Sequence, residues 1–202
     1  MDEEKDLGVI ISKDLKAENN VIHCVKKANK ILGMTKRTFS FLDKEMLVLL
    51  YKVFVRPHLE YNQQACSPYL IKDITLLEGV QRRATKLIKS LAEMPYEERL
   101  KELNLYSLQE RRMRRDQILM FRIMTGDVKI NKSKLFTPMK ISSTRGNSMK
   151  VNTGKICHLN LRQQFFTERV IVPWNSLPEH VVKSTNVEQF KTNYDKWHGL
   201  VA

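Results

Sequence analysis

Residues 73–91 read DITLLEGVQRRATKLIKSL and carry the pattern that decides how this part of the chain folds. Apolar side chains recur there at every third or fourth position, which is the spacing of one face of an α-helix. That face consists of Leu76, Val80, Ala84, Leu87 and Leu91. A helix with this face in a core directs Arg82, Lys86 and Lys89 to the opposite side, with Arg83 at the margin. The stretch therefore predicts a helix that presents four positive charges.

The sequence before this stretch favours two further helices. One is expected over residues 20–37, where apolar side chains follow the same spacing. Another should begin at Asp43, because aspartate is a good N-cap residue. The segment MLVLLYKVFV that follows is apolar nearly all round, which predicts that it is buried. Pro57 should end or kink this helix near Val55 or Arg56.

Two capping boxes mark helices later in the chain. In the first, Ser107 and Glu110 stand three positions apart at the start of a helix that should stop at Gly126. In the second, Thr185 and Glu188 begin the last helix. The stripe of that last helix should dock onto the body of the protein, and it consists of Val187, Phe190, Tyr194 and Trp197.

Two segments do not follow the helical pattern. LGVIIS at residues 7–12 is short and β-branched, which predicts one strand, and the acidic residues before it should fray. Residues 126–160 are rich in Gly, Ser, Asn and Lys and have weak periodicity, which indicates an irregular, basic connector. The expected fold is mainly α: a helical bundle-like body with a short N-terminal strand and a basic irregular connector.

Composition limits the classes of partner and compartment. The chain has 202 residues, 42% of them apolar, and a formal net charge of +13. Such a surplus favours polyanionic partners, nucleic acid first, although a basic domain without any acidic partner also fits it. The sequence has no apolar run long enough to span a bilayer and no signal peptide, so we expect no membrane partner and a nuclear or cytoplasmic protein. The three cysteines are far apart and contain no CxxC pair, which indicates reduced thiols.

The positive charge is concentrated in blocks. Residues 21–58, 80–122 and 123–158 have net charges of +6, +5 and +6, and the first two blocks fall on expected helices. Lysine and arginine on helix faces bind nucleic-acid backbones, with affinity supplied by counterion release. The alternative is a set of solvated helix faces balanced by neighbouring acidic residues. The recurrence on separate elements keeps both interpretations open.

The sequence contains no recognisable catalytic or cofactor motif. A metal-dependent polymerase or nuclease needs clustered carboxylates, and the chain has no Asp-Asp pair, no phosphate-binding loop and no Rossmann glycine pattern. The adjacent pairs His23–Cys24 and Cys157–His158 are poor metal ligands because neighbouring residues point in different directions. We therefore expect no catalytic residue, no metal and no cofactor.

Eight phrases, taken together and in this order, resemble one protein family. They are DLGVIISKDL, VKKANKILGMTKRTF, LYKVFVRPHLEY, SPYLIKDITLLEGVQRRATKLI, YEERLKELNLYSLQERRMRRD, TRGNS, FFTERVIVPWNSLPEHVV and FKTNYDKW. They are similar to the region downstream of the catalytic palm in reverse transcriptases of non-LTR retrotransposons (LINEs) of the chicken-repeat and jockey kind. The resemblance extends from about Lys5 to Trp197.

The resemblance implies a truncated RNA-directed DNA polymerase that lacks the catalytic palm and its paired aspartates. It assigns residues 1–19 to the end of a palm-like strand region and 20–125 to a helical thumb-like domain. The sequence pattern then gives 126–160 as the basic connector and 161–202 as a C-terminal helical segment. It also implies that RNA or DNA backbone is bound by two basic groups. The first group is Arg82, Arg83, Lys86 and Lys89, and the second is Arg111, Arg112, Arg114 and Arg115.

The chain departs from the family pattern at two places. Cys66 stands where the family usually has tryptophan, and Asn147 stands where histidine is common. A cysteine in place of a buried ring leaves a cavity, so Cys66→Trp is expected to stabilise the fold. These departures are typical of a decayed or domesticated retrotransposon copy. The alternative function is a non-catalytic helical module for protein–protein interaction with an incidental basic surface.

Overall fold

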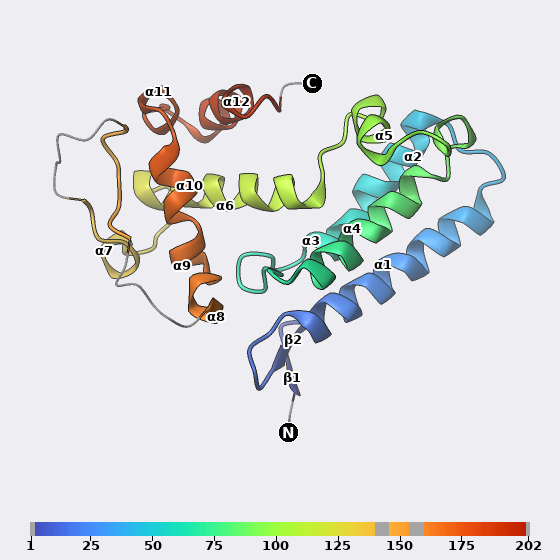
Figure 1. The fold of residues 1–202 in the computed structure, drawn as a ribbon, viewed down its shortest axis with the longest axis horizontal. Coiled ribbons are helices and arrows are strands. Elements are labelled where there is room, and N and C mark those ends of the chain that lie inside the picture. The colour runs from blue at the N-terminus through green and yellow to red at the C-terminus, as the bar shows by residue number, and fades with distance from the viewer. Residues whose placement is uncertain (1–2, 140–145, 154–159, 201–202) are drawn as a thin grey trace. The chain divides into compact units, whose positions relative to one another are not determined.

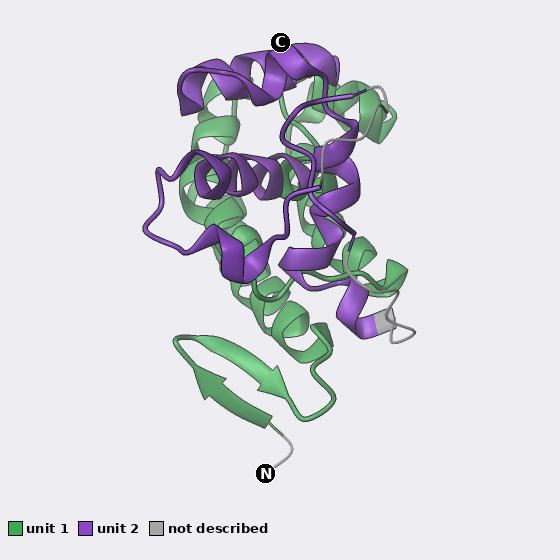
Figure 2. Ribbon diagram, turned by 90° about the vertical axis from the view of Figure 1, so that its left-hand side faces the viewer, with its two compact units in different colours: residues 1–112 green, residues 113–202 purple. Residues whose placement is uncertain are grey.

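Two separate hydrophobic cores organise the chain. The computed structural model describes residues 3–139, 146–153 and 160–200. One core gathers side chains between Ala17 and Leu108, and the other gathers side chains between Met120 and Tyr194. The chain accordingly divides into two compact units, residues 1–112 and 113–202 (Figure 2). Helix α6, Leu108–Thr125, contributes residues to both.

The first unit begins with a β-hairpin and continues as helices (Figure 1). Strand β1, Glu3–Asp6, pairs antiparallel with β2, Val9–Ser12. The helical segments that follow are α1 (Glu18–Thr38), α2 (Lys44–Leu50), the π-helical η1 (Tyr51–Val55), α3 (Arg56–Glu60), α4 (Ile71–Thr85), the 3₁₀ turn η2 (Lys89–Leu91) and α5 (Tyr96–Glu102). The mainly helical fold class and the short N-terminal β element are confirmed.

The β element is a hairpin rather than the single expected strand. Leu7 and Gly8, the two residues between the strands, have φ values of 45° and 84°. Positive φ at both positions of a two-residue loop is the geometry of a type I′ turn, which suits the twist of a hairpin. The Tyr61 hydroxyl donates a hydrogen bond of 2.6 Å to the Leu7 carbonyl and holds the turn. The acidic residues expected to fray, Glu3 and Glu4, form part of β1.

The helix that starts at Asp43 does not end before Pro57. The Asp43 side chain accepts a hydrogen bond from the Met46 N–H at 2.7 Å, so the N-cap is confirmed. The backbone then widens into η1, where the Arg56 N–H bonds to the Tyr51 carbonyl. This π turn shifts the hydrogen-bond register just before Pro57, which has no N–H to donate, and α3 continues to Glu60.

The expectation that this helix is buried all round is wrong. Three of its apolar side chains, Leu49, Val53 and Phe54, are 62%, 52% and 53% exposed. Leu49 and Val53 are four residues apart and lie on one side of the helix, and Phe54 is the next residue along the chain. Leu47, Tyr51 and Val55 are buried, but they are fewer than half of the apolar side chains in this segment.

The second unit is formed by the rest of α6 and a series of short helices. These are α7 (Lys132–Leu135), α8 (Asn160–Gln163), α9 (Phe166–Arg169), α10 (Ile171–Ser176), α11 (Glu179–Val182) and α12 (Val187–Trp197). On α12, Phe190 and Tyr194 are buried as expected, whereas Trp197 is 53% exposed. Gly126, with φ of 82°, follows the end of α6 as predicted.

Part of the expected connector belongs to the second core. Phe136 and Val151 are buried in it, and Pro138 forms an isolated β-bridge with Val151. Asn147 is buried and donates to the carbonyls of Trp174 and Leu177 at 3.1 and 2.9 Å. The irregular segment is therefore fastened to α10 where the structure describes it. Residues 140–145 and 154–159 of the predicted connector lie outside the described part.

The capping predictions are confirmed at one helix and shifted at the other. Ser107 and Glu110 form the reciprocal box at the start of α6: the Ser107 N–H donates to the Glu110 carboxylate at 2.8 Å, and the Glu110 N–H donates to Oγ of Ser107 at 3.2 Å. At α12 the cap is Asn186, which accepts from the Gln189 N–H at 2.8 Å. That helix therefore starts one residue later than expected.

Candidate nucleic-acid interface

Helix α4 has a buried side that differs from the predicted stripe. Val80 and Ala84 are buried as expected, but Leu76 is 43% exposed and Leu77 is buried in its place. Gln81, one position beyond Val80, is fully buried. The helix is thus rotated toward its polar residues. This rotation still leaves Arg82 and Arg83 exposed.

A buried polar network explains the rotation. The Glu78 carboxylate accepts hydrogen bonds from the Tyr96 hydroxyl and, at 3.1 Å, from the Leu108 N–H. The Gln81 side chain donates to the Tyr96 hydroxyl at 2.9 Å and accepts from the Tyr51 hydroxyl. Burial, together with the Glu78 carboxylate, raises the pKa of both tyrosines, so both keep their protons. These bonds hold α4 against the N-terminal ends of α5 and α6.

The predicted single helix over residues 73–91 ends early. Helix α4 stops at Thr85, and the chain then turns through Ile88 into η2. Lys86 caps α4 in helical conformation, four residues after Arg82, and so stays on its side of the helix, whereas Lys89 lies beyond the helix in η2. Both lysines are nevertheless exposed, and within the described residues neither forms an ion pair.

The two arginines face different neighbours. Arg82 lies with its guanidinium 4.2 Å from the centre of the Tyr96 ring, and its Nη2 is 3.9 Å from a Glu97 carboxylate oxygen. Both partners of that ion pair are more than half exposed, so water weakens it strongly. Arg83 donates to the side chain of Asn29 on α1 at 3.0 Å. Neither contact buries the guanidinium.

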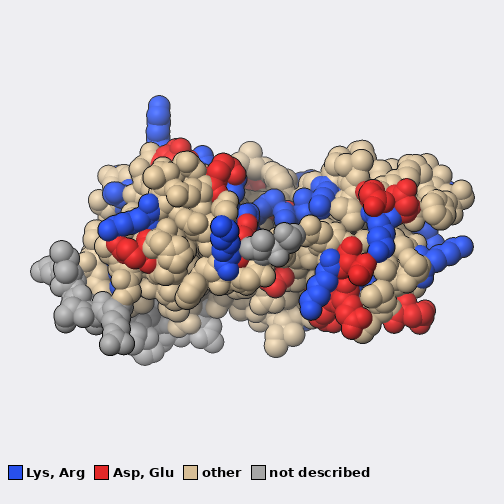
Figure 3. All heavy atoms as spheres, turned by 90° about the horizontal axis from the view of Figure 1, so that it is seen from above, with Lys and Arg blue, Asp and Glu red and all other residues tan. Residues whose placement is uncertain are grey.

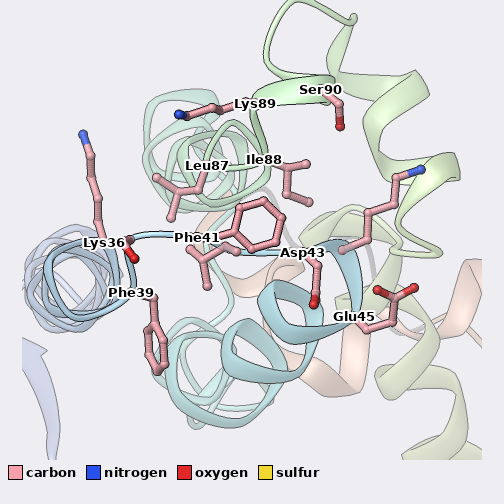
Figure 4. Close-up of a pocket in the computed structure, with 12 residues that line it drawn as sticks. Lys36, Phe39, Phe41, Asp43, Glu45, Leu87, Ile88, Lys89 and Ser90 are labelled. Carbon is pink, nitrogen blue, oxygen red and sulfur yellow. The ribbon is translucent and has the colours of Figure 1, made fainter.

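Helix α1 adds a lysine to this surface. Asn29 and Lys36 are seven residues apart and therefore lie on the same side of α1, two turns from each other. Asn29 meets Arg83, and Lys36 lines a pocket together with Leu87 and Lys89 (Figure 4). Basic side chains from α1 and from the end of α4 thus gather along the junction of these helices. Lys36 is a residue of this surface that the helical pattern over residues 20–37 did not single out.

The second basic group is used inside the protein. Arg111 pairs with Glu60, whose side chain is 3% exposed. Arg114 forms a two-pronged pair with Asp195, at 2.6 and 2.7 Å. Arg112 is buried and Arg115 is half-buried. Arg111 and Arg114 thus hold elements of their own units together, and this arrangement does not support the backbone-binding role that the resemblance implied for them.

Elsewhere on the protein, acidic side chains lie among the basic ones. On the face drawn in Figure 3, Lys and Arg lie interspersed with Asp and Glu. Another example of internal pairing is Arg169, which bonds to the Asp116 carboxylate at 2.8 and 3.1 Å. The net charge of +13 is therefore not spread as one continuous basic face over that side.

Within the described part of the chain, the other residues with metal-binding or reactive side chains do not form a site. Among the described residues, no group of three or more His, Cys, Asp or Glu side chains is placed to hold a metal ion, and no helix is long and apolar enough to cross a membrane. Burial raises the pKa of the Cys24 thiol and lowers the pKa of the neighbouring His23 imidazole. Cys157 and His158 lie outside the described residues.

Cys66 lies beside a small cavity. Burial raises the pKa of its thiol, and a cavity of about 10 Å³ is lined by Cys66, Cys24 and Leu59 among others. A cavity of this size barely admits one water molecule, so it is too small for an indole ring. Beside the half-buried Cys66 there is therefore no vacant space of the size of a ring.

Comparison with known proteins identifies no relative of this chain. No protein-family model matches the chain, and no curated protein and no solved structure is similar to it. The resemblance to LINE reverse transcriptases and the domain limits that it implies therefore stay predictions.

Proposed function

We propose that the chain binds the phosphate backbone of RNA or DNA through the α4 basic surface, defined as Arg82, Arg83, Lys86 and Lys89. The observation that carries this function is the contrast between the two basic groups. The first group is exposed, whereas Arg111 and Arg114 of the second are held in internal ion pairs. The proposal extends to a role as the thumb-like part of a LINE-type RNA-directed DNA polymerase, for which the eight quoted phrases are the support.

The α4 basic surface has the features that backbone binding requires. Arg82 and Arg83 stand on α4, which the Glu78 and Gln81 network fixes from behind, so these two residues need little rearrangement on binding. Each phosphate neutralised by lysine or arginine releases condensed counterions. The slope of log affinity against log salt then changes by about 0.9 per duplex phosphate, or about 0.7 per phosphate of a single strand.

The test is a salt titration of binding to RNA and to duplex DNA. In the variant, all four residues of the α4 basic surface are replaced with glutamine, which is a good helix former. The matched control replaces four exposed lysines outside the surface, Lys13, Lys101, Lys129 and Lys196, and removes the same charge. Circular dichroism confirms that each variant is folded.

We expect the surface variant to bind more weakly to unrelated sequences by a similar factor, because phosphate contacts carry no base information. Its salt slope should be shallower by roughly two to four units. The control variant should change the slope by less, since its charges are scattered. Equal effects of the two variants would show that only net charge matters.

A second function is favoured by the exposed apolar side chains of Leu49, Val53 and Phe54. Exposed apolar residues that share one helix side are typical of protein–protein contact sites. The chain would then be a helical interaction module whose basic surface is incidental. Unchanged affinity and slope in a folded surface variant would favour this second function over nucleic-acid binding.

A further inference from the structure

A pocket of about 610 Å³ lies beside the α4 basic surface in the first unit. Its walls come from the C-terminal end of α1, from the segment 39–45 that leads into α2, and from residues 87–90 (Figure 4). Pockets that hold small organic ligands have volumes of roughly 300–1,000 Å³. The pocket is therefore large enough for a planar group such as a nucleobase.

An exposed aromatic ring stands in this pocket. Phe41 is 78% exposed, although its ring points toward Leu87 and Ile88 (Figure 4). Phe39, two residues earlier, points away from them in the same view. A phenylalanine ring that remains uncovered above apolar neighbours is a surface on which another flat group can stack. The uncovered ring of Phe41 is thus the part of the pocket that a bound ligand would cover.

Charged side chains surround the pocket. The ammonium groups of Lys36 and Lys89 extend from one side, and the carboxylates of Asp43 and Glu45 lie on the other (Figure 4). Lys44, between the two acidic residues in the chain, also lines the pocket, and its ammonium pairs with Glu102 at 2.7 Å. A nucleotide can use both kinds of charge, because its phosphate is anionic and most bases carry hydrogen-bond donors at the edge of the ring.

We propose that this pocket binds one unpaired base of a single-stranded RNA or DNA. The proposal rests on the proposed function, because Lys89 belongs to the α4 basic surface and holds the same backbone. The base stacks on Phe41, and the adjoining phosphates lie near Lys36 and Lys89. A base inside a duplex has both faces covered by its neighbours, so the pocket selects single strands or unstacked ends.

The experiment compares two labelled oligonucleotides of equal length by fluorescence anisotropy. One is a single strand with all its bases, and the other has the same phosphates but abasic sugars throughout. Each is titrated with the wild-type chain, with Phe41→Ala and with the control Phe54→Ala. Phe54 is also an exposed phenylalanine of the first unit, but it does not line the pocket. Since Phe41 is so exposed, its replacement is expected to leave the fold intact.

We expect Phe41→Ala to weaken binding of the base-containing strand by about 5- to 150-fold, the range measured when a stacked aromatic is replaced with alanine. Binding of the abasic strand and the salt slope should not change. In Phe41→Trp, the difference in affinity between the base-containing strand and the abasic strand should stay the same or increase. Quenching of 2-aminopurine in the strand, present in wild type and absent in Phe41→Ala, gives a direct signal of stacking.

The outcomes separate the two proposals. If Phe41→Ala changes neither strand while wild type still binds the abasic one, the backbone function stands and the base pocket is wrong; a peptide then becomes the better occupant. Equal weakening of both strands would also overturn the base pocket, because it would indicate a general effect. If wild type binds neither strand, both proposals fail.

Discussion

Replacing Arg111 with glutamine should destabilise the first unit rather than weaken nucleic-acid binding directly. Arg111 is the residue on which the sequence and the structure differ most clearly: the resemblance made it a backbone-binding residue, and the structure pairs it with Glu60. The Glu60 side chain is 3% exposed and the Arg111 side chain is 20% exposed. Removing the arginine therefore leaves a buried carboxylate without its main partner.

The expected cost follows from this burial. Breaking a buried ion pair by removing one partner costs about 3–5 kcal/mol. Arg56 remains 3.9 Å from the Glu60 carboxylate and offsets part of this, so we expect about 2–3 kcal/mol for Arg111→Gln. For a domain of about 100 residues, that lowers the melting temperature by roughly 10 °C.

The assay is urea or thermal unfolding followed by circular dichroism, together with anisotropy of RNA binding under conditions where each variant is folded. In a double-mutant cycle, Glu60→Gln added to Arg111→Gln should recover part of the loss, because the buried negative charge that has lost Arg111 is then removed as well. The control is Arg122→Gln. Arg122 pairs with Asp127, but both side chains are nearly half exposed, so the cost should stay below about 1 kcal/mol. An unaltered melting temperature combined with a loss of affinity in Arg111→Gln would refute this reasoning and restore the backbone-binding role.

Two further predictions concern one site in each unit. Cys66→Trp should lower stability by about 1–3 kcal/mol in denaturant unfolding, because the cavity of about 10 Å³ cannot accept an indole and the core must open; a raised midpoint would support the stabilisation that the family resemblance implied. In the second unit, Lys183 and hydrogen bonds from Ser148 lower the pKa of Glu179 from 4.5 to about 2. A lowered folded-state pKa stabilises the fold above pH 4.5, and this contribution is lost as the pH falls toward 2, so wild type should lose more stability over that interval than Glu179→Gln. Parallel pH profiles of the two proteins would contradict this role for Glu179.

Much of the local structure follows from short-range rules, which is why it could be predicted. The Asp43 cap, the Ser107–Glu110 box and the stop at Gly126 each depend on residues within three or four positions of one another. The burial of Val80 and Ala84 follows from helical spacing alone. Such rules do not depend on which other elements pack nearby.

The rotation of α4 could not be predicted because it depends on distant partners. Spacing rules treat Glu78 and Gln81 as exposed, and they place Leu76 in the core. In the structure both polar side chains are buried, since Tyr96 and the Leu108 N–H supply their hydrogen bonds from other elements. The apolar residues at 87 and 91 also continue the helical spacing past the point where α4 ends. Leu91 is buried and Leu87 is half-buried in the segment after the helix, so the pattern alone did not mark Thr85 as the last residue.

The same dependence on distant partners decides which arginines can hold a ligand. Short-range sequence rules do not separate Arg83 from Arg114, since both are basic residues on amphipathic helices. Arg114 meets Asp195, 81 residues later, and Arg111 meets Glu60, 51 residues earlier. Among the described residues, Arg83 donates to the neutral Asn29. A carboxylate that already neutralises a guanidinium leaves little attraction for a phosphate, whereas an amide leaves the charge in place. The α4 basic surface is therefore favoured over the second group, because Arg83 contacts an amide and the ion pair of Arg82 with Glu97 is exposed and weak.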